Sequence, residues 1–284
     1  MNEEWTINPL EIDVKEKLGG GTFATVFKGA WRGTDVALKV VKQDMDTHEF
    51  AVEMNVISRL HHPNVLQFLG ACTARFSPQL IVMEYMPNGT LETANKSLQY
   101  SQKVSIVQDI ARGLAYLHNR KPDCIIHRDL KPNNVLLTVS YKAKIADFGL
   151  SCLRPVSNEM YKMTSETGTY RYMAPEVLTH KEYNAKVDIW SFGVILFFMF
   201  QGTPHEGLST KEVVLNVGVN PHGVTFKVPR MTDEMKSVFD KCVNYDPHER
   251  IDALTLVTVC NALTGVEPPR RKLRPRLNFY CFGC

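Results

Sequence analysis

The first eighty residues alternate short apolar runs with turn signals, a pattern typical of β-strands. One run covers Val36–Val41 directly after a turn at residues 32–34, and another covers Leu80–Met83. Between these runs, apolar residues recur at helical spacing along one face: Phe50, Met54, Ile57 and Leu60. The pattern therefore predicts a strand-rich N-terminal region that contains one main helix.

Beyond the turn signature at residues 87–89, the periodicity changes from strands to helices. Five apolar residues share one face of a long predicted helix: Val104, Val107, Ile110, Leu114 and Leu117. We therefore expect an α+β fold with two lobes in one domain over residues 1–264. Its expected parts are a small strand-rich lobe at about 1–83, a connector at about 84–88 and a larger, mainly helical lobe at about 89–264, followed by a basic, proline-containing tail at 265–284.

The most apolar stretch, Phe192–Phe200, has nine residues, whereas a membrane-spanning helix needs about 20. We therefore interpret it as a buried core helix. The first residues, Met-Asn-Glu-Glu-Trp, lack a basic region followed by an apolar run, which argues against a secretory signal. Seven cysteines are scattered without zinc-site spacing, as is typical of a reduced, intracellular chain. These features favour a cytoplasmic protein.

Composition and charge narrow the class of partners. With 284 residues, 44% of them hydrophobic, the chain can bury a substantial core. The net charge is +3, but the tail carries +4 and leaves −1 on the rest, which argues against a broad basic face for nucleic acid. The final residues Cys281–Cys284 loosely fit a prenylation box. A lipid there, together with the basic run Arg270–Arg276, would give weak membrane association; the alternative is a solvated tail.

A glycine-rich stretch, Leu18–Val26, lies between two expected strands. Missing side chains there would let backbone N–H groups approach phosphate oxygens, although such a run is more often a plain hairpin turn. Lys39 follows thirteen residues later inside an apolar strand, where its ammonium could hold the phosphates that the loop covers. Glu53 on the following helix could orient Lys39.

Charged and amide side chains are concentrated in residues 127–134, His-Arg-Asp-Leu-Lys-Pro-Asn-Asn, and in a later Asp-Phe-Gly triplet. Phosphoryl transfer requires an acid near the attacking hydroxyl, a cation near the γ-phosphate and oxygen ligands for magnesium. Asp129 and Lys131 supply the first two. Asn134 and Asp147, the first residue of the triplet, supply the ligands.

These motifs occur in an order that resembles a eukaryotic protein kinase domain over residues 10–264. The resemblance is carried by Gly19-x-Gly21, Ala37-x-Lys39, Glu53, His127-Arg128-Asp129, Asp147-Phe148-Gly149 and Ala174-Pro175-Glu176. It implies a two-lobed kinase fold, with ATP bound between the lobes, Mg²⁺ as the metal and a protein as the phosphate acceptor. Ala24 replaces the third loop glycine of the family, for which we expect slightly altered nucleotide affinity and not inactivity.

The resemblance also assigns roles to individual residues. The implied catalytic residues are Lys39, Glu53, Asp129, Lys131 and Asn134. The implied ATP contacts are Leu18, Gly19, Gly20, Gly21, Thr22, Phe23, Ala24, Val26, Ala37, Lys39, Met83, Glu84, Met86, Leu136 and Asp147. The implied magnesium ligands are Asn134 and Asp147. Among the ATP contacts, the backbone of Glu84–Met86 would bind the adenine, and Met83 would narrow the back of its pocket.

The phosphate acceptor is indicated by residues 131–133, Lys-Pro-Asn, which resemble those of serine/threonine kinases. Thr169 points the same way, because its hydroxyl would bridge Asp129 and Lys131. Residues 168–176 are similar to the tyrosine-kinase-like group, whose members mostly phosphorylate serine and threonine. Dual specificity, a tyrosine-directed enzyme and an inactive kinase fold acting as a scaffold stay open. The sequence indicates neither the substrate, nor the activator, nor the oligomeric state.

Other residues have regulatory or structural roles by resemblance. Hydroxyls between the Asp-Phe-Gly and Ala-Pro-Glu triplets, on Thr164, Ser165 and Thr167, are candidates for phosphorylation that pairs with Arg128 and switches activity on. Three structural roles are implied as well. Asp188 accepts backbone N–H bonds, Arg250 pairs with Glu176, and four side chains stack between the lobes: His127, Phe148, Ile57 and Phe68.

Overall fold

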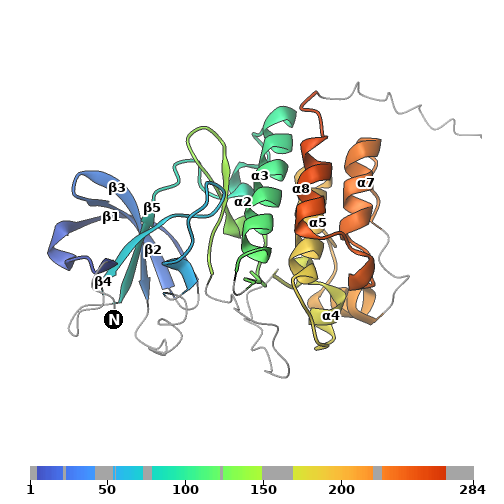
Figure 1. Cartoon of the computed structure of the whole chain (residues 1–284), viewed down its shortest axis with the longest axis horizontal. Helices are drawn as coiled ribbons and strands as arrows, with labels where there is room; N and C mark the ends of the chain where they lie inside the picture. Colours follow the sequence, from blue (N-terminus) through green and yellow to red (C-terminus); the bar gives the residue numbers. More distant parts are fainter. Residues whose placement is uncertain are drawn as a thin grey trace, which may run out of the picture.

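The computed structural model describes the chain in these ranges: 5–21, 24–41, 54, 56–72, 79–121, 124–148, 169–219 and 226–266. Strands occupy the N-terminal side and helices the C-terminal side, and the two parts lie next to each other as separate lobes (Figure 1). The predicted two-lobed α+β fold is therefore confirmed. The predicted sites Thr22, Phe23, Glu53, Thr164, Ser165, Thr167 and Cys281 lie outside the described residues.

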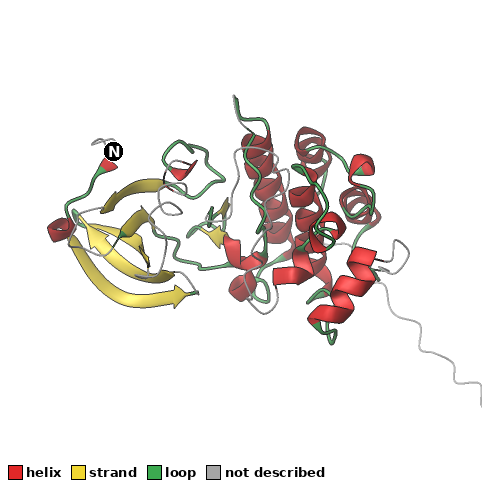
Figure 2. Ribbon diagram, turned by 90° about the horizontal axis from the view of Figure 1, so that it is seen from below, coloured by secondary structure: helices red, strands yellow, loops and turns green. Residues whose placement is uncertain are grey.

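The N-terminal lobe contains one antiparallel sheet, which is five-stranded over the described ranges. Its strands are β1 (Ile12–Gly20), β2 (Ala24–Trp31), β3 (Thr34–Val41), β4 (Phe68–Cys72) and β5 (Leu80–Glu84), in the spatial order β1-β2-β3-β5-β4. Figure 2 shows the strands in yellow, gathered on the side of the molecule that carries the N-terminus. Both predicted strands are confirmed, as β3 and β5. Lys39 lies opposite Val26 on one side and Ile81 on the other, so it occupies the middle of the sheet.

The predicted helix between β3 and β4 is described only at its end. The amide of Ser58 donates to the carbonyl of Met54 over 3.1 Å, which is the hydrogen bond of an α-helical turn. Met54, Ile57 and Leu60 of the predicted stripe are all buried, as expected. Phe50, the first residue of the stripe, lies outside the described part of the chain.

The C-terminal lobe is mainly helical. Its α-helices are α2 (Leu91–Ala94), α3 (Tyr100–His118), α4 (Pro175–Leu178), α5 (Lys186–Gln201), α6 (Thr210–Val213), α7 (Asp233–Cys242) and α8 (Ala253–Asn261). A π-helical segment, η5 (Val214–Val219), continues α6, and the short 3-10 turns on this side are η3 (Pro132–Asn134), η4 (Thr169–Tyr172) and η6 (Pro247–Glu249). A further 3-10 turn, η2 (Pro9–Glu11), lies directly before β1. Strands β6 (Val135–Leu137) and β7 (Ala143–Ile145) form a hairpin.

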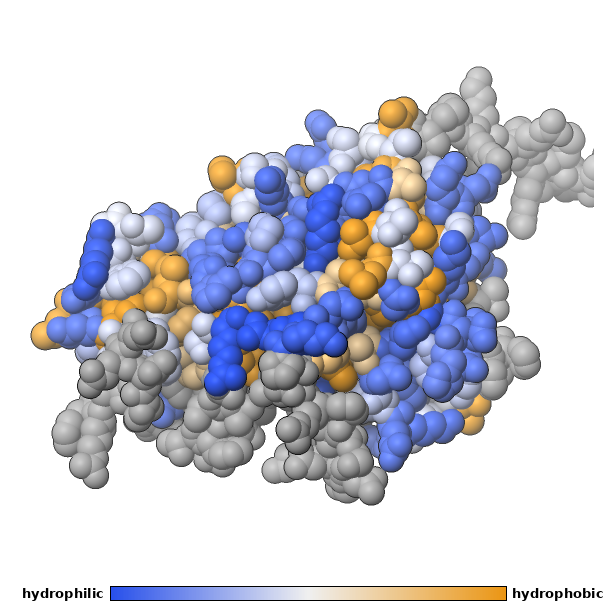
Figure 3. Space-filling view, in the orientation of Figure 1, coloured by the Kyte–Doolittle hydropathy of each residue, from blue (hydrophilic) through white to orange (hydrophobic). Residues whose placement is uncertain are grey.

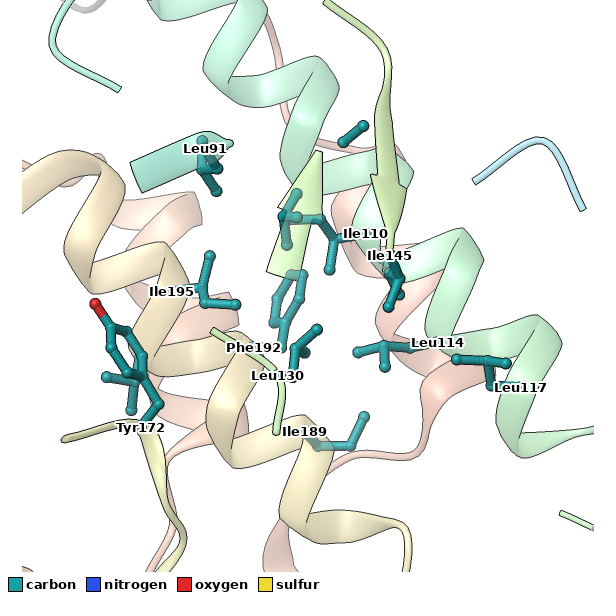
Figure 4. Packing of buried hydrophobic residues seen from close by; sticks show 14 of the residues in the cluster. Leu91, Ile110, Leu114, Leu117, Leu130, Ile145, Tyr172, Ile189, Phe192 and Ile195 are labelled. Carbon is teal, nitrogen blue, oxygen red and sulfur yellow. The ribbon is translucent and has the colours of Figure 1, made fainter. Parts of the chain in front are cut away.

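The helical core is built where α3 and α5 meet that hairpin. All five residues of the predicted stripe on α3 are buried, and α5 is apolar on nearly every side. Figure 4 shows Leu114 of α3, Ile145 of β7 and Phe192 of α5 converging from different elements. Gly113 lets α3 pack closely against Asn64 and β7, because a Cβ at this position would lie 2.8 Å from the Asn64 carbonyl oxygen and from Ile145 Cδ1. The core therefore holds the hairpin that follows residues 127–134.

The surface agrees with this division into core and solvent-facing side chains. Figure 3 shows a mostly hydrophilic face with smaller apolar areas on both the strand-rich side and the helical side. The prediction for Phe192–Phe200 is confirmed, since this stretch forms the second half of a buried helix. Within the described ranges, no helix combines the length and the apolar character needed to cross a bilayer.

A buried ion pair joins α4 to the segment before α8, as the sequence implied. Arg250 Nη1 and Nη2 donate to the two carboxylate oxygens of Glu176 over 2.6 and 2.8 Å. The Arg250 side chain is fully buried and its guanidinium lies over the Trp190 ring, 5.1 Å from the centroid. Charges removed from water in this way depend on each other, because either one alone would lack a counter-ion.

Replacing one member of this pair should destabilise the fold strongly. Arg250→Met leaves the Glu176 carboxylate buried without its cation, so the free energy of unfolding should fall by about 3–5 kcal/mol. Arg32→Met is the matched control, because Arg32 pairs with Glu11 at an exposed site, where solvent screening leaves such pairs little effect on stability. Urea unfolding followed by circular dichroism measures both. Equal losses in the two variants would contradict the structural role of the buried pair.

Candidate active site

The loop at residues 127–134 is fixed by one buried carboxylate from α5. Asp188 Oδ2 accepts the backbone N–H of His127 at 2.8 Å, and its Oδ1 accepts that of Arg128 at 2.9 Å. His118 Nε2 lies 2.8 Å from Oδ2 and adds a third partner. Arg128 has a φ of +70°, an unfavourable region for a non-glycine residue, and these hydrogen bonds compensate for it. The predicted structural role of Asp188 is confirmed.

Asp129 is buried and holds two polar partners on one oxygen only. Its Oδ2 lies 2.9 Å from Lys131 Nζ and 3.0 Å from Asn134 Nδ2. Its Oδ1 is buried and, within the described part of the chain, has no hydrogen-bond partner. Burial raises the pKa of Asp129, and the Lys131 ammonium opposes this rise. One carboxylate oxygen is thus held in place while the other is left for a hydrogen-bond donor.

Lys131 also reaches the start of the segment after residue 168. Its Nζ donates to Thr169 Oγ1 over 3.0 Å. The contact between Lys131 and Thr169 that the sequence implied is therefore present, and Asp129 is linked to it through Lys131.

Asp147 contacts Lys39 from the opposite lobe. Lys39 Nζ lies 3.1 Å from Asp147 Oδ1, and the positive charge of Lys39 lowers the pKa of Asp147. The Asp147 side chain is 51% exposed, and its backbone φ is +63°. The sequence suggested Glu53 as the partner of Lys39, but Glu53 lies outside the described residues. The sequence did not predict the contact between Lys39 and Asp147, because its motifs indicate a phosphate contact for Lys39 and a magnesium ligand for Asp147.

The loop around Asp129 and the strand end before Asp147 are joined by their backbones. The amide of Ala146 donates to the Asn134 carbonyl over 2.9 Å. His127 Nε2 lies 2.9 Å from the Ala146 carbonyl, and its ring meets the Phe148 ring edge-on at 5.2 Å. His127 is fully buried, which fits the packing role expected for it. Asp129, Asn134 and Asp147 are therefore positioned by one connected set of contacts.

Apolar side chains gather beside the connector between the lobes. Met83, Met86 and Leu136 pack in one small cluster with Leu66 and Ala146. Three other predicted adenine contacts, Leu18, Val26 and Ala37, lie on β1, β2 and β3. Leu18 is 45% exposed, whereas Ala37 is buried.

The Glu84 side chain ties the connector to both lobes. Its carboxylate lies 2.6 and 2.8 Å from Lys144 Nζ on β7 and accepts the Gln67 amide at 2.7 Å. The sequence did not predict these contacts of Glu84, because no spacing rule links it to Lys144, 60 positions later, or to Gln67, 17 positions earlier. The backbone of Glu84 pairs with Val36 in the sheet.

The glycine-rich stretch forms the turn between β1 and β2. The Gly21 amide donates to the Ala24 carbonyl over 2.9 Å and closes the turn. Among the described residues, a Cβ at Gly19 would meet nothing within 4 Å, whereas one at Gly20 would lie 3.2 Å from the Ala24 carbonyl oxygen. The close contact at Gly20 shows why this position of the turn favours glycine.

Arg128 presents guanidinium nitrogens that the described residues do not satisfy. Its Nε and Nη2 are buried without a hydrogen-bond partner among those residues, and its guanidinium lies 5.5 Å from the centroid of the Tyr183 ring. A buried, unpaired cation is costly, so an anionic partner would stabilise it.

Known proteins match nearly the whole chain. A family model described as protein tyrosine and serine/threonine kinase matches residues 12–259. Serine/threonine-protein kinase VIK from Arabidopsis thaliana is 40% identical over 272 residues, which cover 89% of this chain and 61% of that protein. Serine/threonine-protein kinase CTR1 from the same organism is 36% identical over 277 residues, covering 92% of this chain and 33% of that protein.

A relative from another organism gives a similar match. Probable serine/threonine-protein kinase drkC from Dictyostelium discoideum is 38% identical over 252 residues, covering 84% of this chain and 33% of that protein. The chain thus spans between a third and three fifths of the length of these curated relatives.

The charge on Lys131 should control the pKa of Asp129. Lys131→Met removes the cation that opposes the effect of burial, so the pKa of Asp129 should rise further. Carbon-13 NMR titration of the carboxyl groups measures this, with Asp129→Asn identifying the resonance. Lys142→Met, at an exposed site, is the control and should leave the titration unchanged. A lower pKa in Lys131→Met would show that Lys131 does not act on Asp129 as described.

Proposed function

The chain belongs to the protein tyrosine and serine/threonine kinase family, and we propose that it transfers the γ-phosphoryl group of ATP to serine and threonine hydroxyls of proteins. The observation that carries this proposal is the open Oδ1 of Asp129, which is buried beside Lys131 and linked through Asn134 to the strand end before Asp147. A donor hydroxyl would satisfy that oxygen, and phosphoryl transfer needs its acceptor hydroxyl held in this way.

Each polar residue of the site has a distinct task in the transfer. The acceptor hydroxyl donates a hydrogen bond to Asp129 Oδ1, its oxygen forms a bond to the γ-phosphorus, and the bond from that phosphorus to the bridging oxygen breaks. The hydroxyl proton passes to Asp129, whose raised pKa makes it a better proton acceptor once it is ionised. Lys131 offsets negative charge beside the acceptor, and ADP leaves with the bridging oxygen.

Asn134 and Asp147 fit a magnesium site. The low pKa of Asp147 keeps its carboxylate ionised at neutral pH, and its side chain is half exposed. Asn134 donates from its amide nitrogen to Asp129, so its amide oxygen could coordinate a metal ion. Two protein oxygens with phosphate oxygens are a usual ligand set for Mg²⁺, which supplies charge neutralisation for the phosphates when bound.

The nucleotide is placed by contacts from both lobes. The apolar cluster of Met83, Met86 and Leu136 beside the connector offers a surface for the adenine. Lys39, held by Asp147, offers a cation for the phosphates, and the turn at Gly19–Gly21 lies on the same sheet.

Serine and threonine are favoured over tyrosine as acceptors by two observations. The contact of Lys131 with Thr169 is the arrangement that the Lys-Pro-Asn stretch implied for serine/threonine kinases. The relatives compared above are all named serine/threonine-protein kinases. A scaffold without activity is disfavoured, because Lys39, Asp129 and Asp147 are all present and paired.

Regulation by phosphorylation is part of the proposal. The Nε and Nη2 groups of Arg128, which have no partner among the described residues, would donate hydrogen bonds to a phosphate group. Thr164, Ser165 and Thr167 are the candidate carriers, and they lie outside the described residues. The predicted weak membrane association of the tail also depends on residues beyond Val266, so it stays a prediction.

The direct test is phosphate transfer by Asp129→Ala. Removal of the proton acceptor should lower kcat by about 10²–10⁴-fold, while nucleotide affinity is retained because Asp129 does not hold ATP. Transfer of radiolabelled γ-phosphate to a peptide library, followed by phosphoamino-acid analysis, measures both rate and acceptor type. Asp240→Ala, on an exposed face of α7, is the control. Transfer by Asp129→Ala at the wild-type rate, or phosphotyrosine alone, would contradict the proposal.

The regulatory proposal is tested by combining phosphatase with an Arg128 variant. Dephosphorylation should lower the turnover of the wild type, because Arg128 loses its anionic partner. The same treatment should have little effect on Arg128→Ala, because this variant lacks the guanidinium that would bind the phosphate. Arg120→Ala, whose guanidinium binds the Arg59 carbonyl instead, should respond like the wild type. An equal response of all three proteins would mean that Arg128 does not read the phosphate.

A further inference from the structure

The residues before β1 extend the sheet beyond its last strand. β4 ends the strand order, so its outer edge would be unpaired without another segment. Thr6 forms a parallel bridge with Ala71, and the Ile7 amide donates to the Ala71 carbonyl over 2.9 Å. Cys72 Sγ donates to the Ile7 carbonyl over 3.1 Å. Residues 5–7, the edge segment, therefore bind β4 along its backbone.

The edge segment also contacts the core that both lobes share. The Trp5 ring meets the Phe68 ring at 5.9 Å with an interplanar angle of 73°, an edge-to-face contact. Phe68 belongs to the large buried cluster that includes Ile57 and Phe148, and Trp5 packs against this cluster. Phe148 follows Asp147 directly and touches the His127 ring. Packing is thus continuous from Trp5 to the residue next to the proposed magnesium ligand.

Ile7, two residues later, has a different packing environment. It lies in the smaller cluster of the N-terminal lobe with Val36, Leu38 and Cys72. Ile7 and the hydrogen bonds of the edge segment cover β4 at Ala71 and Cys72. Covering the edge of β4 does not require the contact of Trp5 with Phe68, so that contact has another role.

Gly70 shows that β4 is shaped to receive the edge segment. A Cβ at Gly70 would lie 2.5 Å from Ile7 Cδ1 and 2.7 Å from the Trp5 carbonyl oxygen. The register of β4 against β5 shifts between Phe68 and Gly70, so the ladder is irregular at this point. A larger residue at position 70 would push residues 5–7 away. Glycine at this position therefore allows the edge segment to approach β4 closely.

We propose that Trp5 is a positioning residue for phosphoryl transfer. By filling the side of Phe68, it limits the movement of β4 against the shared core, and through Phe148 it keeps Asp147 in register with Lys39. The claim rests on the proposed function for its kinetic consequence but not for its structural one. Loss of Trp5 should loosen the alignment of Asp147 and leave the acceptor loop, which Asp188 holds, in place.

Trp31 offers a matched control for the loss of a tryptophan side chain. It is also partly buried in the N-terminal lobe, but it packs against the cluster of Ile7, Val36 and Leu38 and donates to Glu11. Trp5→Ala and Trp31→Ala therefore remove the same side chain from two sites that differ in contact with Phe68. Gly70→Ala displaces the edge segment with the Trp5 indole still present, and Trp5→Phe retains an aromatic ring.

The full chain of each variant is assayed at a temperature well below its unfolding midpoint. Trp5→Ala and Gly70→Ala should lower kcat by about ten-fold, with the KM for the peptide changed by less than about two-fold. Trp31→Ala should keep kcat within about two-fold of the wild type, and Trp5→Phe should recover most of the loss. An equal kcat in Trp5→Ala and Trp31→Ala would overturn the proposal.

Amide hydrogen exchange gives a readout that does not need activity. The Ala146 amide, bonded to the Asn134 carbonyl, reports whether the strand end before Asp147 stays in place. Its exchange should accelerate in Trp5→Ala and not in Trp31→Ala. A wild type that transfers no phosphate would sink the proposed function, and the exchange comparison would still decide the role of Trp5. Unchanged exchange in Trp5→Ala would refute the positioning role.

Discussion

The buried carboxylate of Asp188 is the constraint on which the site depends. Two adjacent backbone amides, those of His127 and Arg128, converge on its two oxygens. Arg128 has a positive φ in this arrangement, and Asp129 follows it directly. Without a charge-assisted acceptor at this point, the strained turn would relax, and Asp129 would lose its fixed direction. The position of α5 therefore fixes the conformation of the loop at residues 127–134 through Asp188.

Two carboxylates close to this loop are driven to opposite behaviour by their surroundings. Burial raises the pKa of Asp129, whereas the Lys39 charge lowers that of Asp147. An acid with a raised pKa accepts a proton more readily once ionised, and an acid with a lowered pKa stays ionised as a metal ligand. The sequence contains the same residue type at both positions. Only the folded surroundings separate a proton acceptor from a ligand.

Local patterns in the sequence predicted much of this structure, but pairs of distant side chains escaped them. The stripe on α3 and the strands β3 and β5 follow from periodicity, because burial of one face imposes it. The pairing of Arg250 with Glu176 was implied only by the family's motifs. The contacts of Lys144 with Glu84 and of Lys39 with Asp147 were missed, since they depend on how the two lobes meet. No local sequence pattern predicts which side chains of the two lobes come into contact.

The two lobes also differ in how their parts are held, which explains why an edge contact can matter for alignment. The helical lobe has a large core in which α3 and α5 pack against the β6–β7 hairpin. The sheet lobe has a smaller cluster of its own, so its position on the shared core depends on a few side chains such as Phe68. Lys39 lies on that sheet and Asp147 on the helical side. A contact that restrains Phe68 therefore acts on the distance between the two charged groups, even though Trp5 touches neither.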